Sequence, residues 1–252
     1  MCTLALYFQE FADFPLIVAA NRDEFFHRPS ASPHVLLTDP LIIGGKDLLA
    51  GGTWLGINQY GLLAGILNRR SGTEKNQASL RSRGLLCLDV LAARDPLQAC
   101  AFLKGQKGSA YQPFNLLFAN PEHAYVAYDG GEEISCIKLG KGLHVLSNTS
   151  LYDARSEKMD QAHLLFSRAK GHLREWDFSS GVRVLREVLS DHVSGENSNN
   201  PKDAICVHTE SYGTVSSTII FYSRVEKRYH TYYAPGPPCN AEHEKSLTLD
   251  VV

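Results

Sequence analysis

The sequence lacks the features that mark membrane and secreted proteins. No apolar run reaches the roughly 18 residues that a membrane-spanning helix requires, and the N-terminus has no positively charged segment of the kind that begins a secretory signal. The formal net charge is -2, so nucleic acids and anionic membranes are not expected partners. We therefore expect a cytoplasmic protein, and the sequence does not indicate its oligomeric state.

Several common motifs are also absent. The sequence contains no GxSxG, P-loop, GxGxxG or HExxH pattern, which argues against an elbow-type serine hydrolase, a P-loop NTPase, a dinucleotide enzyme and a zincin. The six cysteines are scattered without close pairs, which indicates neither a disulfide framework nor a CxxC metal site. The ten histidines show no ligand spacing. We expect most cysteines to be buried thiols, the histidines to be surface or core residues, and no metal site.

The first two predicted strands form a hairpin. Residues 3 to 8 and 15 to 20 are rich in β-branched, aromatic and other apolar residues, and the segment between them suits a hairpin connection. The run at 15 to 20 is apolar almost throughout, as in a strand covered on both faces. It leads into four polar residues that either meet other strand ends in a functional site or form a solvated loop. These residues are Asn21, Arg22, Asp23 and Glu24.

A second hairpin is predicted around a turn at residues 58 to 61, and it brings Asn68 to a strand end. Before it, three prolines between residues 28 and 48 indicate an irregular connector. After it, residues 69 to 83 carry five basic residues and one acidic residue, so five minus one gives +4. This segment is either a solvated, mobile loop or the lip of a binding site for an anionic ligand.

The rest of the chain alternates between groups of helices and groups of strands. This order argues against a doubly wound parallel fold and favours large antiparallel sheets with helices packed on them. Helices are predicted at 83 to 93, 96 to 104, around 159 to 169 and at 182 to 189, with a mobile loop at 194 to 202. Strands are predicted as a meander at 114 to 118, 124 to 128, 133 to 139 and 143 to 146, then at 218 to 222 and 229 to 234, before a Pro-Gly-rich tail.

Cys2 is the first candidate for catalysis. If Met1 is removed, residue 2 carries both a thiol and a free α-amine, whose pKa of roughly 7.7 to 8.0 lets it take up the thiol proton near neutral pH. The nucleophile and its base then belong to one residue. The alternative is that Cys2 is a small apolar residue near a frayed chain end.

Six short motifs along the chain carry a family resemblance. They are Met1-Cys2-Thr3, Ala-Asn-Arg-Asp-Glu at 20 to 24, Gly-Gly-Thr-Trp-Leu-Gly-Ile-Asn at 51 to 58, Ser-Arg-Gly at 82 to 84, Pro-Phe-Asn-Leu-Leu at 113 to 117, and Leu-Ser-Asn at 146 to 148. Together they resemble the NRDE family, also called the transport and Golgi organisation two family, over about residues 1 to 220. That family is in turn similar to the cysteine-type N-terminal nucleophile hydrolases, which include penicillin V acylase and bile salt hydrolase.

The resemblance implies an α+β fold, a four-layer αββα sandwich of two largely antiparallel sheets in one domain over residues 1 to 252. It also implies roles for individual residues. Cys2 is similar to the nucleophile, and Asp23, accompanied by Arg22, is similar to the acid that orients the terminal amine. Asn68 and Asn148 are similar to two asparagines that support the oxyanion, where a well-placed amide donor contributes about 3 to 4 kcal/mol.

Two features depart from the pattern of those amidases. The amidases separate the Arg and the Asp by two residues, whereas Arg22 and Asp23 are adjacent and point to opposite faces of a regular strand. We expect Asp23 to face the thiol, with Arg22 or Glu24 supporting it. In addition, Val215 stands where the resemblance leads us to expect an arginine. The candidates to replace that arginine are Arg69 and Arg224.

Two functions follow from the resemblance. The first is hydrolysis of a small-molecule, non-peptide amide or thioester by Cys2 after Met1 removal. The alternative is binding or trafficking of haem, acyl-coenzyme A or lipid in the same cleft without turnover. The family that the sequence resembles has been linked to haem mobilisation and to the handling of lipid and acyl-coenzyme A. A scaffold role ranks third. No cofactor is required, and haem is a candidate ligand. The residues expected to contact a ligand are Asn21, Glu24, Trp54, Arg69, Arg70 and Arg83.

Overall fold

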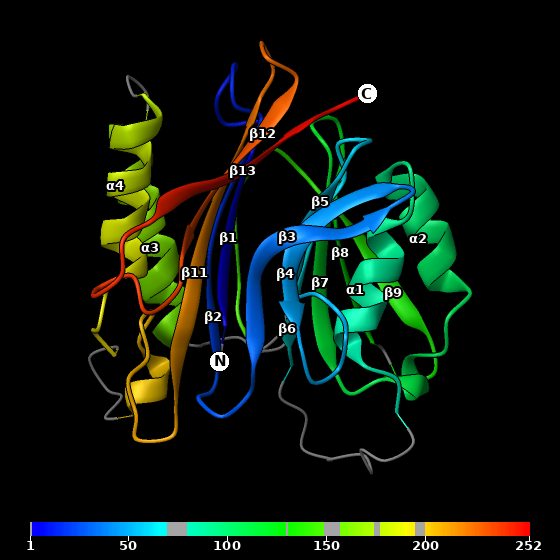
Figure 1. The fold of residues 1–252 in the computed structure, drawn as a ribbon, viewed down its shortest axis with the longest axis horizontal. Helices are drawn as coiled ribbons and strands as arrows, with labels where there is room; N and C mark the ends of the chain where they lie inside the picture. The colour runs from blue at the N-terminus through cyan, green and yellow to red at the C-terminus, as the bar shows by residue number, and fades with distance from the viewer. Residues whose placement is uncertain (1, 70–79, 130, 149–156, 174–176, 195–199) are drawn as a thin grey trace.

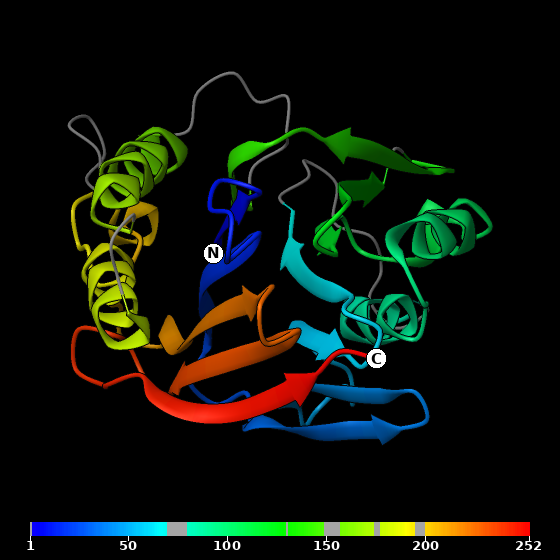
Figure 2. The ribbon, with the colours of Figure 1, turned by 90° about the horizontal axis from the view of Figure 1, so that it is seen from above.

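The computed structural model describes residues 2–69, 80–129, 131–148, 157–173, 177–194 and 200–252. Within these ranges two antiparallel sheets lie face to face, and a pair of helices covers the outer face of each sheet (Figure 1). Figure 2 shows the same layers from above, with one helix pair on each side of the molecule. The predicted αββα order is confirmed. No helix among the described residues is long and apolar enough to cross a membrane.

The six-stranded sheet contains the first predicted hairpin, in which β1 (Thr3–Phe8) and β2 (Leu16–Phe25) pair antiparallel. Side chains of β1 alternate between its two faces: Leu4 packs in the core between the sheets, and Ala5 packs against the helices. Burial of both faces explains why these strands are apolar almost throughout. The sheet has the order β10-β1-β2-β11-β12-β13, with β10 (Gly142–Leu146), β11 (Tyr212–Ser223), β12 (Arg228–Ala234) and β13 (Glu244–Asp250).

The seven-stranded sheet is a meander in which each strand pairs with the next one along the chain. It includes the second predicted hairpin, β5 (Leu55–Asn58) and β6 (Leu63–Asn68). The Asn58 side chain fixes the turn, because its Oδ1 accepts hydrogen bonds from two backbone N–H groups within it. The other strands are β3 (Ser30–Thr38), β4 (Leu41–Asp47), β7 (Phe114–Ala119), β8 (Ala124–Asp129) and β9 (Ile134–Leu139).

The prediction of an irregular connector at residues 28 to 48 is wrong, because this segment forms β3 and β4. Pro33 lies inside β3, which is an edge strand, and the pairing register shifts between Ala31 and His34. An edge strand with such an irregularity tolerates proline, which has no N–H to donate to a partner strand. Pro40 lies in the turn between the two strands.

The four strands predicted between residues 114 and 146 do not form one meander. β7, β8 and β9 are consecutive neighbours, but β10 crosses to the other sheet and pairs with β1, where Leu146 lies opposite Leu4. The short apolar pattern of β10 contains no information about which sheet it joins. The crossing brings residue 148 to the chain segment that begins at residue 2.

The C-terminal region also differs from the prediction. In place of a tail after residue 234, the chain adds β13 to the edge of the six-stranded sheet, pairing with β12. Only Leu249 is fully buried in β13, so its mostly polar sequence hides the strand. β11 begins at Tyr212, six positions before the predicted start at 218, and runs along β2 as far as Phe25.

All four predicted helices are present in the described residues. α1 (Arg83–Leu91) and α2 (Pro96–Lys104) lie on the seven-stranded sheet, and α3 (Glu157–His172) and α4 (Phe178–Leu189) lie on the six-stranded sheet (Figure 1). Asp95 caps α2 by accepting hydrogen bonds from two backbone N–H groups of its first turn. In the predicted loop at 194 to 202, residues 195–199 lie outside the described residues. Short 3-10 helices occupy Gly108–Ala110 and Pro201–Asp203.

We expect Leu103→Ala to lower the free energy of unfolding by about 2 to 5 kcal/mol, because Leu103 is fully buried between α2 and the seven-stranded sheet. Leu97→Ala is the matched control: it makes the same change on the same helix at a side chain that is 58% exposed, and should change stability by less than about 0.5 kcal/mol. Chemical denaturation measures both. Equal losses would contradict the observed packing face of α2.

Candidate functional site

Several of the polar residues at the strand ends line one cleft with a volume of about 450 Å³. The cleft lies where the ends of β2 and β6 meet the start of α1 and the residue that precedes β1. It therefore collects residues that are far apart in the sequence. Of the residues predicted for the site, those that line the cleft are Cys2, Arg22, Asp23, Glu24, Trp54, Asn68 and Arg83.

Cys2 is held at the wall of the cleft by Asn148. The backbone N of Cys2 donates a hydrogen bond to Asn148 Oδ1 at 2.7 Å. Asn148 is buried and follows β10 by two positions. The residue before Asn148 is also held in place, because Asn115 Nδ2 donates a hydrogen bond to the Ser147 carbonyl at 3.0 Å. Pairing of β10 with β1 thus brings together two residues that are 146 positions apart.

Arg22 and Asp23 lie on opposite faces of β2, as their adjacency requires. Thr3 pairs with Asn21, so continuation of this register sets Cys2 beside Arg22. Cys2 packs against the core between the sheets, next to Trp54, and the Arg22 guanidinium lies over the Trp54 ring at 4.4 Å. Arg22 rather than Asp23 shares the face of Cys2, which is the reverse of the expected orientation.

The Arg22 guanidinium is buried and has several partners on this face. It donates to Ser30 Oγ at 3.3 Å and lies 3.8 Å from an oxygen of Asp47. The same Asp47 oxygen accepts a 2.7 Å hydrogen bond from Arg28. Burial alone would raise the pKa of Asp47, but hydrogen bonds from Ala50 N and Arg28 outweigh burial and hold that pKa below its ordinary value. A carboxylate shared by two guanidinium groups fixes this wall of the cleft.

The Asp23 side chain points toward the helical layer. Two residues that the sequence analysis missed contact it, Thr214 on the neighbouring strand β11 and Lys158 on α3. Thr214 Oγ1 donates to one carboxylate oxygen at 2.7 Å, and Lys158 Nζ lies 3.6 Å from the other. Lys158 is 2% exposed. Burial raises the pKa of Asp23, and the charge of Lys158 opposes that rise. Helical spacing could have revealed Lys158, because it shares the buried face of α3 with Ala162 and Phe166.

The thiol of Cys2 is protonated near neutral pH. Burial raises its pKa and the nearby negative charge of Asp23 raises it further, while the hydrogen bond to the Asp23 backbone and, to a smaller extent, the charge of Arg22 offset part of the rise. Its Sγ lies 3.8 Å from Asp23 O, the contact that links the two residues directly. The same carbonyl also accepts a hydrogen bond from a hydroxyl, because Tyr212 donates to Asp23 O at 3.1 Å. A thiol with a raised pKa needs a base to become a thiolate.

Asn68 and Arg83 line the opposite wall of the cleft. Asn68 ends β6 with an exposed side chain. Arg83 begins α1, and its Nη1 donates to a neutral carbonyl, Pro113 O, at 2.9 Å. Burial lowers the pKa of Arg83. Of the basic segment at residues 69 to 83, Arg81 and Arg83 line the cleft, whereas residues 70–79, including Arg70, lie outside the described residues.

Two of the predicted ligand-contacting residues are engaged outside the cleft. The Asn21 side chain donates to Leu189 O at 2.8 Å and to Ile205 O at 3.0 Å. It therefore ties β2 to the end of α4 and to the segment that precedes β11. Arg69 donates to the backbone and side chain of Asp129 at 2.7 and 2.9 Å. Neither is among the residues that line the cleft.

Val215 lies at an irregularity in β11, where the pairing with β2 shifts between Thr214 and Ser216. Neither expected substitute brings a guanidinium to the cleft: Arg69 is paired with Asp129, and Arg224 follows the opposite end of β11, where its backbone N donates to Asp13 O. The guanidinium groups that line the cleft belong to Arg22, Arg28, Arg81 and Arg83.

The sequence matches a family model described as Transport and Golgi organisation 2 over residues 1–232. Two mammalian proteins are similar to this chain over most of its length. The Transport and Golgi organization protein 2 homolog of Bos taurus is 30% identical over 230 residues, and that of Homo sapiens is 31% identical over 234 residues. In both cases the alignment covers 82% of this chain and 82% of the relative.

The fold matches solved N-terminal nucleophile hydrolases. A variant of the conjugated bile acid hydrolase from Clostridium perfringens superposes with a TM-score of 0.60 at 12% identity, covering 100% of this chain and 99% of that one. The N-acylethanolamine-hydrolyzing acid amidase ortholog of Caenorhabditis elegans gives a TM-score of 0.56 at 14% identity, covering 87% of this chain and 92% of that one. The expected N-terminal nucleophile hydrolase-like fold is thus confirmed.

We expect Lys158→Met to lower the free energy of unfolding by about 3 to 5 kcal/mol near neutral pH, because it removes a positive charge from beside the buried Asp23 carboxylate. Loss of Lys158 raises the folded-state pKa of Asp23 further. Protonation of Asp23 then stabilises the folded state, so the loss should shrink as the pH falls through that pKa. Chemical denaturation at neutral and mildly acidic pH measures this dependence.

Lys170→Met is the control for this prediction, because Lys170 lies on the same helix and its ion pair with Glu10 is partly exposed. The control should lose less than about 1 kcal/mol. A Lys158→Met loss that equals the control, or that does not change with pH, would contradict the buried ion pair.

Proposed function

The chain belongs to the Transport and Golgi organisation 2 family, and we propose that it is a cysteine N-terminal nucleophile hydrolase of a non-peptide amide or thioester. The observation that carries the proposal is the position of Cys2. Its side chain opens onto the cleft, and its backbone N is held by Asn148 Oδ1 at 2.7 Å. The thiol proposed as nucleophile and the Cys2 nitrogen, which becomes an amine on loss of Met1, would thus be held together at the wall of the cleft.

Proton transfer within residue 2 supports this proposal. The raised pKa of the Cys2 thiol keeps the proton on sulfur near neutral pH, so attack requires a base close to Sγ. The α-amine freed by Met1 removal has an ordinary pKa of roughly 7.7 to 8.0, which suits a base that accepts the proton and later returns it. Asn148 Oδ1 would hold this amine through the hydrogen bond it already makes with the nitrogen.

The proposed reaction has two stages. In the first, the α-amine takes the thiol proton, Cys2 Sγ bonds to the substrate carbonyl carbon, and the carbonyl oxygen becomes an oxyanion. The bond to the leaving group breaks as the α-ammonium returns the proton to it, which leaves a thioester on Cys2. In the second, water gives a proton to the α-amine and attacks that thioester, releasing the acid and restoring the thiol.

Other residues of the cleft suit supporting roles. The Asn68 side chain, which lines the cleft without being buried, is our candidate donor to the oxyanion together with the Asn148 amide. The Asp23 carboxylate, which is paired with Lys158, would supply a negative charge close to residue 2. Arg83 is the candidate to bind an anionic group of the substrate, and Phe25, which is 47% exposed, offers an apolar surface to an acyl chain.

The alternative of haem or acyl-coenzyme A binding without turnover has less support. Binding of phosphates or propionates needs free cationic groups in the cleft. Among the described residues, most of the guanidinium groups of the cleft already have carboxylate partners: Arg22 and Arg28 contact Asp47, and Arg81 pairs with Asp89. The names of two structural neighbours, a hydrolase and an acid amidase, also favour cleavage of an acyl bond.

We expect Cys2→Ala to abolish turnover of a panel of N-acyl amides and acyl thioesters, because it removes the proposed nucleophile. Cys100→Ala is the matched control, since Cys100 lies on α2, away from the cleft, and its loss should leave turnover within about twofold of the parent protein. Release of acid is measured by liquid chromatography and mass spectrometry. An acylating probe that labels Cys2, located by peptide mapping, provides a second measurement. Unchanged turnover in Cys2→Ala, or no labelling and no turnover with any substrate, would contradict the proposal.

We also expect the active form of the protein to lack Met1, because only then does Cys2 carry a free α-amine. Intact mass spectrometry of the purified protein, together with N-terminal sequencing, determines the fraction that begins at Cys2. Turnover per molecule should rise in proportion to this fraction across preparations made with and without a co-expressed methionine aminopeptidase. Full turnover in a preparation that retains Met1 entirely would exclude the α-amine as the base.

A further inference from the structure

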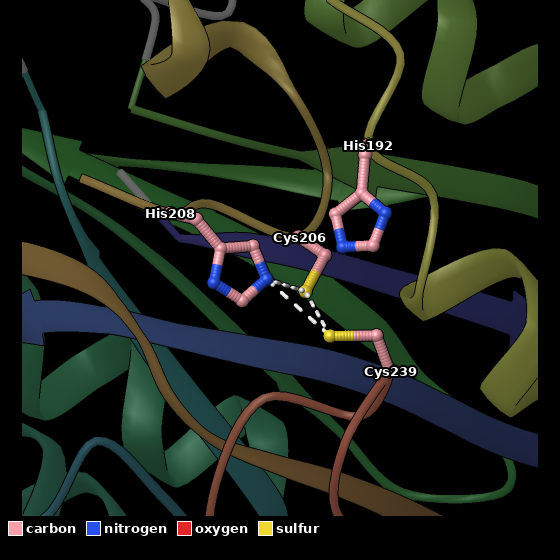
Figure 3. A group of neighbouring side chains, drawn as sticks. All are labelled: His192, Cys206, His208 and Cys239. Carbon is pink, nitrogen blue, oxygen red and sulfur yellow. Dashed lines mark hydrogen bonds between the residues drawn. The ribbon is translucent and has the colours of Figure 1, made fainter.

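Four potential metal ligands meet at a place outside the cleft, which none of them lines. They are His192, Cys206, His208 and Cys239, and one ligand atom from each lies within 4.8 Å of the other three. Figure 3 shows the four side chains pointing toward one another from three separate segments. No other such group of three or more histidine, cysteine or acidic residues occurs among the described residues. The spacing in the sequence, which indicates no metal site, concealed this group.

The separations within the group match a tetrahedral metal centre. A zinc ion bound at about 2.3 Å from sulfur and about 2.0 to 2.1 Å from nitrogen sets two sulfurs about 3.8 Å apart and a sulfur and a nitrogen about 3.5 Å apart. The sulfurs of Cys206 and Cys239 are 3.8 Å apart. His208 Nε2 lies 3.5 Å from the first sulfur and 3.3 Å from the second. The fourth residue, His192, is exposed; its ring centroid lies 5.1 Å from that of His208, and one of its nitrogens is within 4.8 Å of the other three ligand atoms.

The backbone around these residues is fixed by hydrogen bonds that need no metal. Cys206 N donates to Asp191 O at 2.8 Å, which holds the segment before β11 against the residue that precedes His192. His208 forms an isolated β-bridge with Gly213 at the start of β11. The donors are therefore brought together by the fold itself, as a preformed site requires.

Neither a disulfide nor a haem fits these distances as well as a metal ion does. A disulfide requires sulfurs about 2.05 Å apart, and Cys206 and Cys239 are both free at 3.8 Å. Haem iron accepts protein ligands at its two axial positions on opposite sides of the ring, so it does not suit four converging donors. Two thiolates and two imidazoles are instead the ligand set that zinc binds in structural sites.

We propose that His192, Cys206, His208 and Cys239 bind one Zn²⁺ ion as a structural site. Four protein ligands fill a tetrahedral shell and leave no position for substrate or water. Binding converts the two thiols to thiolates and releases two protons to solvent, with no change of oxidation state. The ion would join the end of α4, the segment before β11 and the connection between β12 and β13.

The proposed ion would also support the back of the cleft. Val207 lies between two of the ligands. Its backbone N donates to Thr214 Oγ1, and its carbonyl accepts from Thr214 N. Thr214 Oγ1 in turn donates to Asp23. Asn21 donates to Leu189 O and Ile205 O, next to the segments that hold His192 and Cys206. Loss of the ion should therefore loosen the partners of Asp23 without removing any residue that lines the cleft.

The test measures the metal directly on the full-length protein. Protein purified under reducing conditions should contain one equivalent of zinc by elemental mass spectrometry and native mass spectrometry. After removal of the metal with a chelator, titration with Co²⁺ should produce thiolate-to-cobalt charge-transfer absorption and the intense ligand-field bands of a tetrahedral ion. Added Zn²⁺ should displace the cobalt and raise the thermal unfolding temperature, because it binds the folded state.

Variants identify the ligands. His192→Ala, His208→Ala and Cys239→Ser should each weaken Zn²⁺ binding by at least about tenfold, and Cys239→Ser should also reduce the charge-transfer absorption. His192 and His208 are exposed, so their variants test the site even if changes at the buried Cys206 prevent folding. Cys100→Ser is the control. Cys100 also contacts a second thiol, that of Cys136, but lies in no group with a third ligand, and its loss should not affect metal binding.

Three results would overturn the proposal. One is a chelator-treated, fully reduced protein that binds neither Zn²⁺ nor Co²⁺. Another is cobalt bound without thiolate charge-transfer absorption, or with an affinity that the His192 and His208 variants leave unchanged. The third is a Cys206–Cys239 disulfide in protein isolated with thiol exchange blocked, detected as a mass difference on reduction.

Discussion

The register of β1 against β2 determines the arrangement at the cleft. Both strands are buried on both faces, so a slip of one residue would move every side chain to the wrong layer. The observed register puts Leu4 in the core between the sheets and Ala5 under the helices. At the open ends of the strands it necessarily sends Arg22 toward Trp54 and Asp23 toward α3. Apolar packing along the strands thus decides where each charge at their ends lies.

The cleft combines groups with strong electrostatic coupling and little freedom to move. Asp23 is held by Lys158 and Thr214 on one side of the sheet, and Arg22 by Asp47 on the other. Such buried charges are expensive unless they are paired, so these contacts are conditions for the fold as well as for the site. Burial also keeps the proton on the Cys2 thiol. In the proposed mechanism the Cys2 thiol depends on a base next to it, and that need connects N-terminal processing with the proposed activity.

One short region contributes to both the proposed metal site and the surroundings of Asp23. The start of β11 carries Tyr212 and Thr214, which donate hydrogen bonds to Asp23, and the residues before β11 include Cys206 and His208. Asn21, which begins the Asn-Arg-Asp-Glu motif, does not line the cleft; its side chain secures the backbone of this region. The motif therefore places a structural anchor, Asn21, next to two buried charged residues that are candidates for the site, Arg22 and Asp23.

The sequence by itself determined the layered αββα architecture, the hairpins β1–β2 and β5–β6, the four helices and Cys2, Asp23, Asn68 and Asn148 as site candidates, because apolar periodicity and family motifs are local patterns. Only the tertiary structure decided that β10 joins β1, which brings Asn148 to Cys2. It likewise decided that Lys158 meets Asp23, and that His192, Cys206, His208 and Cys239 converge. These contacts join residues far apart in the sequence. Their partners are selected by packing between layers, which no pattern within a single segment specifies.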